Sequence, residues 1–202
     1  MALLLNTLSL PRCPHCRIDT PYLSKSWEVD STDAEGQNKR LWRVYRCNKC
    51  GRMVLAYASG HNVEVAGVFP STPTVDEAIP ERAREYLSQA LNSIHAPAGA
   101  IMLTASSVDA MLKEKGYKSG TLYARIEQAA ADHLITTEMS AWAHEIRLDA
   151  NDERHSDPTS PLPVTTDAER AIDFAQALGQ FLFVLPSRIT RGRKVAKEQQ
   201  SN

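Results

Sequence analysis

The chain of 202 residues has 43% hydrophobic side chains and a net charge of -1, a composition that fits a globular protein of one or two domains and excludes a fibrous or disordered one. No stretch approaches the roughly 20 apolar residues that a membrane-spanning helix needs, and the apolar start MALLLNTLSL has no basic residue before its leucines and no small-residue cleavage site after them. We therefore expect a cytoplasmic protein without a membrane contact.

Charge is distributed unevenly along the chain. Residues 1–70 carry nine Lys and Arg against six Asp and Glu, residues 71–187 carry nine against seventeen, and residues 188–202 carry five against one. A basic head and a basic tail therefore flank an acidic body. Because an acidic surface repels phosphate, we expect any contact with nucleic acid at the ends of the chain or in a local pocket.

All four cysteines lie near the N-terminus in two pairs, Cys13-Pro-His-Cys16 and Cys47-Asn-Lys-Cys50. Two residues between thiolates let one tight turn present both sulfurs to the same ion, and two such turns complete a tetrahedral site. We therefore predict that Cys13, Cys16, Cys47 and Cys50 bind a structural Zn²⁺ ion. The absence of cysteine from the rest of the chain disfavours the alternative of two disulfides in a secreted domain. His15 is an alternative ligand, but four thiolates already fill the tetrahedron.

Segments of alternating polarity around these turns predict a β zinc ribbon within residues 1–70. Residues 26–31 and 41–47 alternate large apolar with polar side chains and flank the turn DAEGQNKR, and residues 53–59 and 62–69 meet at Gly60-His61. A zinc ion with four thiolates carries a charge of -2, which nearly cancels the surplus of the ribbon. This favours a structural role for the ribbon, with nucleic-acid binding as the alternative.

A proline-rich linker at residues 69–80 is followed by segments with helical periodicity. They span residues 80–96, 97–116, 121–133, 136–155 and 166–185, the last opening with the capping-box sequence Thr166-Asp-Ala-Glu169 and ending before Pro186. We predict an α+β protein in which the ribbon precedes a five-helix antiparallel bundle at residues 71–187, and a disordered basic tail at residues 188–202. The sequence has no glycine-rich phosphate loop and no nucleophile elbow.

The fourth helical segment carries a stripe of polar side chains. A step of about 100° per residue places Arg147, Asn151 and His155 on one edge of that helix, together with His144 and Arg154. In a catalytic reading His155 removes the proton of an RNA 2'-hydroxyl, Arg147 stabilises the charge on phosphorus and Asn151 orients the group. In the alternative reading the arginines pair with neighbouring acids and the stripe only ends the helix. We assign no role to His61, His95, His133 or His144.

The order of these segments resembles a known bacterial family. A ribbon, then VFPS, GAIMLTASSVDAMLKEKGY, TLYARIEQAAADHLIT and WAHEIRLDANDERH resemble the family of domain of unknown function 4145, which is HEPN-like. The family pattern Arg-x-x-Gly-Asn-x-x-x-His is matched by Arg147, Asn151 and His155, with Ala150 in the place of the glycine. The segment TASSVDAML lacks the two arginines of the family sequence RRALE.

The resemblance implies a helical homodimer and two functions. HEPN proteins include metal-independent ribonucleases in toxin and antiphage systems, in which an Arg is followed four to six residues later by His. Seven residues separate Arg147 from His155 here, and a helical turn displaces a side chain by about 5.4 Å. We therefore expect a dimeric accessory or regulatory module of a bacterial defence or restriction system, with a protein or RNA partner. A metal-independent endoribonuclease using Arg147, Asn151 and His155 is the alternative.

Overall fold

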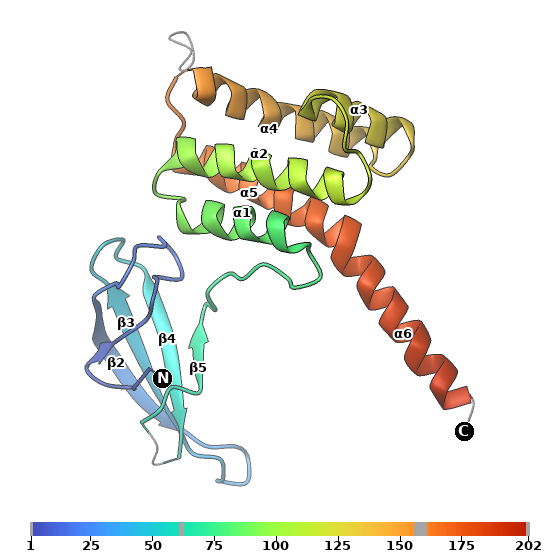
Figure 1. Cartoon of the computed structure of the whole chain (residues 1–202). Helices are drawn as coiled ribbons and strands as arrows, with labels where there is room; N and C mark the ends of the chain where they lie inside the picture. Colours follow the sequence, from blue (N-terminus) through green and yellow to red (C-terminus); the bar gives the residue numbers. More distant parts are fainter. Residues whose placement is uncertain (1, 61–62, 156–160, 201–202) are drawn as a thin grey trace. The chain divides into compact units, whose positions relative to one another are not determined.

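The computed structural model describes residues 2–60, 63–155 and 161–200, and it leaves the side chains of residues 153–155 and 195–200 outside the description. The chain divides into two compact units, residues 1–73 and 74–202 (Figure 1). The first is a β unit and the second is helical, so the prediction of an α+β protein is confirmed. No helix among the described residues is long and apolar enough to cross a membrane.

The first unit is one antiparallel sheet in which every strand pairs with the next one in the sequence. Its strands are β1 (Thr7–Leu8), β2 (Leu23–Ser31), β3 (Arg40–Cys47), β4 (Met53–Ser59) and β5 (Gly67–Phe69). The predicted strands β2, β3 and β4 are confirmed, whereas only residues 67–69 of the fourth predicted segment form a strand. Alternate side chains of β3 and β4 enter a core with Leu4 and Leu8 of the N-terminal segment.

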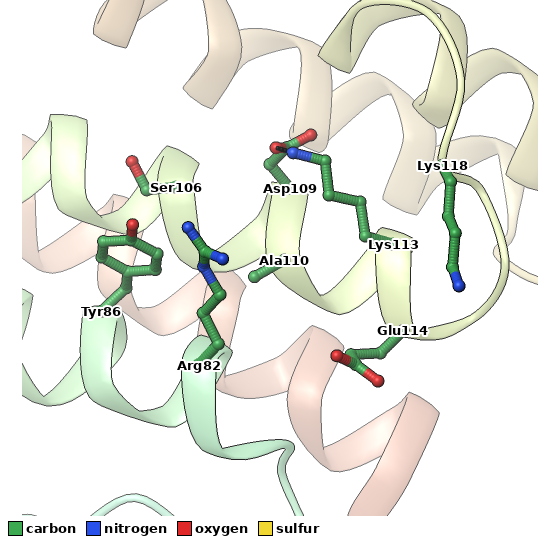
Figure 2. Close-up of a pocket in the computed structure, with 8 residues that line it drawn as sticks. All are labelled: Arg82, Tyr86, Ser106, Asp109, Ala110, Lys113, Glu114 and Lys118. Carbon is green, nitrogen blue, oxygen red and sulfur yellow. Dashed lines mark ion pairs between the residues drawn. The ribbon is translucent and has the colours of Figure 1, made fainter.

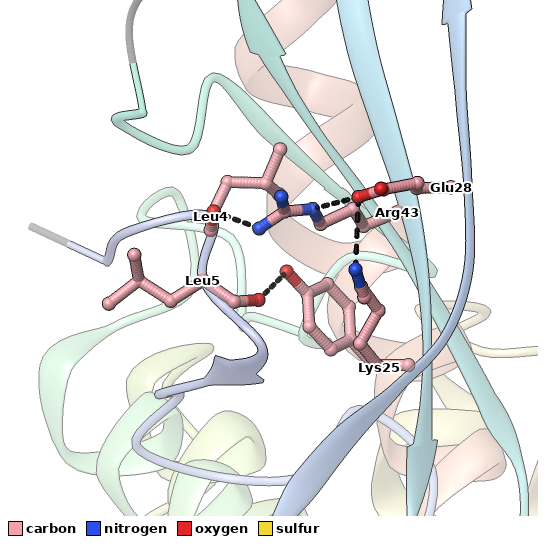
Figure 3. Close-up of polar contacts among 6 residues, drawn as sticks. Leu4, Leu5, Lys25, Glu28 and Arg43 are labelled. Atoms are coloured by element: carbon pink, nitrogen blue, oxygen red, sulfur yellow. Dashed lines mark hydrogen bonds and ion pairs between the residues drawn. The ribbon is translucent and has the colours of Figure 1, made fainter.

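A polar network attaches this N-terminal segment to the inner side of the sheet (Figure 3). The hydroxyl of Tyr45 donates to the carbonyl oxygen of Leu5 at 2.7 Å, and Nη1 of Arg43 donates to the carbonyl oxygen of Leu4. Nε of Arg43 also pairs with Glu28 of β2 at 2.9 Å. Because Tyr45 is completely buried, burial raises the pKa of its hydroxyl, which stays a neutral donor.

The second unit is a helical bundle. Its elements are α1 (Glu81–Asn92), α2 (Pro97–Glu114), α3 (Leu122–Ala131), α4 (Thr137–His155), α5 (Thr165–Gly179), the π-helical segment η1 (Gln180–Val184) and α6 (Leu185–Gln200). Apolar side chains at helical spacing form one core, for example Leu87 on α1 and Met111 on α2. A buried hydroxyl joins these two helices, because Oγ of Ser107 donates to the carbonyl oxygen of Ala83 at 2.8 Å.

The C-terminal helices correct the sequence prediction. Helices α5, η1 and α6 follow one another without a break and form one rod in Figure 1, so the prediction that Pro186 ends the helix is wrong. Proline lacks an amide hydrogen and clashes with the carbonyl four residues earlier, and the π-helical turn before Pro186 relieves this clash. Helix α6 continues to Gln200, in contrast to the disordered tail expected from the sequence.

The start of α5 also differs from the predicted capping box at Thr166 and Glu169. Helix α5 begins at Thr165, and Oδ2 of Asp167 accepts a hydrogen bond from the backbone amide of Val164 at 2.9 Å. The N-cap is therefore Val164, two residues before the predicted Thr166, and Asp167 takes the capping role expected of Glu169. An acid in the first turn is favourable there because the unpaired backbone amides carry partial positive charge.

Candidate metal centre and helical pocket

The two predicted cysteine turns come together at one end of the sheet. One ligand atom from each of Cys13, Cys16, Cys47 and Cys50 lies within 4.8 Å of the other three, and all four cysteines are free thiols. The sulfurs of Cys13 and Cys50 are 4.0 Å apart. A tetrahedral ion with bonds of about 2.3 Å to sulfur separates its ligands by about 3.8 Å, whereas a disulfide needs about 2.05 Å. The cluster therefore fits a metal ion and not a pair of disulfides.

Both turns have the same backbone geometry, which explains why this spacing works. The amide of Arg17 donates to the carbonyl oxygen of Cys13 at 3.0 Å, and the amide of Gly51 donates to that of Cys47 at 2.8 Å. Arg17 and Gly51, each directly after the second cysteine of its pair, have φ of 59° and 72°. The left-handed conformation turns the chain away after both sulfurs have been placed. Arg17 is strained by it, and its guanidinium is buried close to Cys13.

The pKa values of three of the clustered thiols depart from the ordinary value. Burial raises the pKa of Cys16 to about 12 and raises that of Cys50. Burial also tends to raise the pKa of Cys47. Backbone amides of Cys50 and Lys49 donate hydrogen bonds to its sulfur, however, and the net result is a lowered pKa. Sulfur that receives amide hydrogen bonds is prepared to carry charge. A divalent cation is the partner that lets all four carry it together.

His15 does not join the cluster. Its Nε2 lies 2.8 Å from the carbonyl oxygen of Met53 and therefore donates to it. The side chain crosses from the first cysteine turn to the start of β4 and leaves the four sulfurs as the ligand set. This agrees with the expectation that His15 replaces no cysteine.

A pocket of about 310 Å³ lies between α3 and α4 in the helical unit. Its lining is Ala105, Thr121, Leu122, Tyr123, Arg147, Ala150 and Asn151. Arg147 and Asn151, two of the three residues predicted for catalysis, therefore line the same pocket. Ala150, directly before Asn151 in the chain, lines the pocket as well and is buried.

Aromatic and acidic side chains of α3 hold the polar stripe of α4. The guanidinium carbon of Arg147 lies 5.4 Å from the ring centre of Tyr123, and the ring of His144 lies 4.8 Å from the same ring. Nε2 of His144 is 2.7 Å from a carboxylate oxygen of Glu127. Among the described residues, no carboxylate forms an ion pair with Arg147, and its buried Nε has no hydrogen-bond partner. The pocket thus contains a positive charge that the described part of the chain does not neutralise.

The structure describes only the backbone of His155, the third residue predicted for catalysis. The backbone of His155 belongs to α4, so the helix runs unbroken from Arg147 through Asn151 to this position. The side chains of His155 and Arg154 lie outside the described residues. Sequence reasoning missed Tyr123 and Glu127, because their roles depend on how α3 packs against α4. The order Tyr123, Glu127 at a spacing of four was the available signal, since it places an aromatic ring and an acid on one face.

Comparison with known proteins identifies the helical unit. A family model described as "Domain of unknown function (DUF4145)" matches residues 81–197, more than half of the chain. The chain belongs to this family. The match begins at Glu81, the first residue of α1, and so excludes the sheet. No curated protein and no solved structure matches the chain.

The DUF4145 domain has a second pocket, of about 510 Å³, beside α1 and α2 (Figure 2). At its centre Asp109 pairs with Lys113 at 2.5 Å and with Arg125 of α3 at 2.6 Å. Arg82 and Lys118 line the same pocket without an ion pair to any described residue, and Glu114 also lines it. The central carboxylate is thus neutralised from two helices, which gives this pocket a structural role in joining α2 to α3.

Proposed function

We propose that this DUF4145 protein is a dimeric, HEPN-like accessory or regulatory module of a bacterial defence or restriction system. Its α3–α4 pocket holds an anionic group of a partner, either a protein carboxylate or a nucleic-acid phosphate. The observation that carries the proposal is that Arg147, which lines this pocket next to Asn151, has no carboxylate partner among the residues that the structure describes. In a helical unit with an excess of acids, a guanidinium with no carboxylate partner among the described residues, a buried Nε without a hydrogen-bond partner and a neighbouring amide together favour the binding of an anion.

The proposed role of the first unit is to form a structural zinc ribbon. Four thiolates in tetrahedral spacing are the ligand set that Zn²⁺ prefers in structural sites, and they leave no open position for a substrate. The sheet around the cluster has only a small apolar core. A unit of about 70 residues gains much of its stability from such a metal ion.

A metal-independent endoribonuclease is the second candidate. The continuity of α4 favours it, because Arg147, Asn151 and His155 occupy positions four residues apart along one helix edge. In this mechanism His155 removes the 2'-hydroxyl proton and Arg147 stabilises the charge at phosphorus, giving a 2',3'-cyclic phosphate. Arg147 and His155 are farther apart in the sequence than the Arg and His of the HEPN ribonucleases, and for this reason the ribonuclease is the second candidate.

Affinity purification of the tagged full-length protein from its native host tests the first candidate. The variant Arg147→Gln removes the charge of the pocket, and Arg170→Gln, which changes an exposed arginine of α5, is the control. We expect the wild type and the control to retain the partner and Arg147→Gln to retain at least tenfold less of it. Parallel samples with nuclease separate a protein from a nucleic-acid partner. Equal recovery by all three proteins contradicts the proposal.

An RNA cleavage assay without divalent ions in the buffer tests the second candidate. Cleavage by the wild type that disappears in His155→Ala, with unchanged circular dichroism, supports the ribonuclease. The absence of cleavage, or equal cleavage by the variant, eliminates it. Light scattering on the same samples measures whether the protein is a dimer.

A further inference from the structure

The outer side of the sheet exposes a large apolar surface. Side chains that alternate with those of the core point to this side, which we call the aromatic face. It consists of Trp27, Val29, Arg40, Trp42, Val44, Arg46, Met53, Leu55, Tyr57 and Phe69. None of them belongs to the core of either unit, and Trp27 and Phe69 are 57% and 50% exposed. A contiguous surface of this kind marks an interaction site.

Three rings of the aromatic face come from three neighbouring strands and contact one another. The ring centres of Trp42 on β3 and Tyr57 on β4 are 4.6 Å apart, and Phe69 on β5 lies 6.3 Å from each of them. Tyr57 pairs with Gly67, where a Cβ atom would lie 2.5 Å from the tyrosine ring. Glycine therefore lets this ring lie flat across β5. The backbone builds a continuous platform of aromatic rings.

All charged side chains of the aromatic face are positive. The guanidinium of Arg40 lies 5.7 Å from the ring centre of Tyr57, and Arg46 is exposed on the same strand. Among the described residues neither arginine forms an ion pair. The acids of β2, Glu28 and Asp30, are the cross-strand partners of Arg43 and Leu41. Their side chains therefore lie on the core side of the sheet. The face thus combines aromatic rings with arginines and contains no carboxylate.

We propose that the aromatic face binds single-stranded nucleic acid. Unpaired bases stack on its rings, and the phosphates of the same strand contact Arg40 and Arg46. Only a partner with flat apolar groups and a regular negative charge complements both features, and a duplex hides its base faces. The site lies outside the residues that the DUF4145 model matches, and the inference does not rest on the function proposed for the α3–α4 pocket.

Fluorescence anisotropy with the metal-loaded full-length protein tests this inference. The probes are labelled oligouridylate, labelled oligothymidylate and a duplex of the same length, which separate RNA, DNA and paired strands. We expect a single strand to bind more tightly than the duplex, with log K falling with log salt at a slope of about -1.4 from two phosphate contacts. Trp27→Ala should weaken binding by about 5- to 150-fold through the loss of stacking. Arg46→Gln should reduce the slope by about half.

Two matched variants in the helical unit serve as controls. Phe181→Ala removes another exposed ring and Arg82→Gln another arginine without an ion pair to a described residue, and both should leave binding unchanged. Failure to bind any single strand overturns the inference, as does binding that Trp27→Ala and Arg46→Gln do not alter. Loss of binding in Arg147→Gln alone would place the nucleic acid in the α3–α4 pocket instead. Self-association that Trp27→Ala abolishes would assign the face to a second copy and also overturns it.

Discussion

Gly179 of α5 lies directly against Ile79 in the core of the helical unit. A Cβ atom at Gly179 would lie 2.5 Å from Cδ1 of Ile79 and 3.3 Å from Cε of Met111, both of which are buried. We therefore predict that Gly179→Ala destabilises the protein. The cost of overpacking is about 1–3 kcal/mol and exceeds the helix-propensity gain of up to about 1 kcal/mol. Urea unfolding followed by far-UV circular dichroism measures the difference.

Gly192 of α6 provides the matched control. It is also helical, but nothing lies within 4 Å of a Cβ atom at this position. Gly192→Ala should therefore increase helix content, because alanine is favoured over glycine by about 0.8–1 kcal/mol in a helix interior. If both variants change stability in the same direction, Gly179 is not at a close approach between α5 and Ile79.

Removal of the hydroxyl of Tyr45 tests the attachment of the N-terminal segment. Tyr45→Phe keeps the buried ring but loses the hydrogen bond to Leu5, so we expect a loss of about 0.5–1.5 kcal/mol in the free energy of unfolding. Tyr22→Phe is the control, because Tyr22 is 61% exposed and should tolerate the change. Tryptophan fluorescence reports on this unit through Trp27 and Trp42. Equal stability of the two variants would show that the hydrogen bond contributes nothing.

The sequence predicted those features that depend on local patterns. Alternation identified β3 and β4, and the spacing of the cysteines predicted the cluster of four sulfurs. Strand β1 was missed because its two residues are too few to show alternation and pair with Leu23 and Ser24, far along the chain. The contact of His144 with Glu127 was missed because it depends on the packing of two helices. Pro186 was misread because a π-helical turn is not visible in the sequence.

Removal of the proposed metal ion should unfold the first unit and leave the second intact. A chelator, or the variant Cys50→Ser, takes away the ion that we propose the four cysteines bind, and the small core of the sheet does not replace it. We expect the near-UV signal of Trp27 and Trp42 to be lost while the far-UV helical signal persists. His15→Ala should retain one metal ion per chain, since His15 contacts Met53 instead. A sheet that survives chelation contradicts a structural metal site.

Two aspartates of the helical unit should respond in opposite directions to replacement by Asn. Burial raises the pKa of Asp149, so its charged form is disfavoured in the folded state and its contribution to stability decreases as pH rises through that pKa. Asp149→Asn should therefore stabilise the protein near neutral pH, and this gain should vanish well below the ordinary pKa of an aspartate.

Asp109→Asn breaks the ion pairs to Lys113 and Arg125, so it should lower the free energy of unfolding by about 1.5–3 kcal/mol at neutral pH. Urea unfolding at neutral pH and at a pH well below the ordinary pKa of an aspartate measures the effect of each variant. A loss of stability in Asp149→Asn at neutral pH would show that the contact of Asp149 with Arg170 outweighs the cost of its burial.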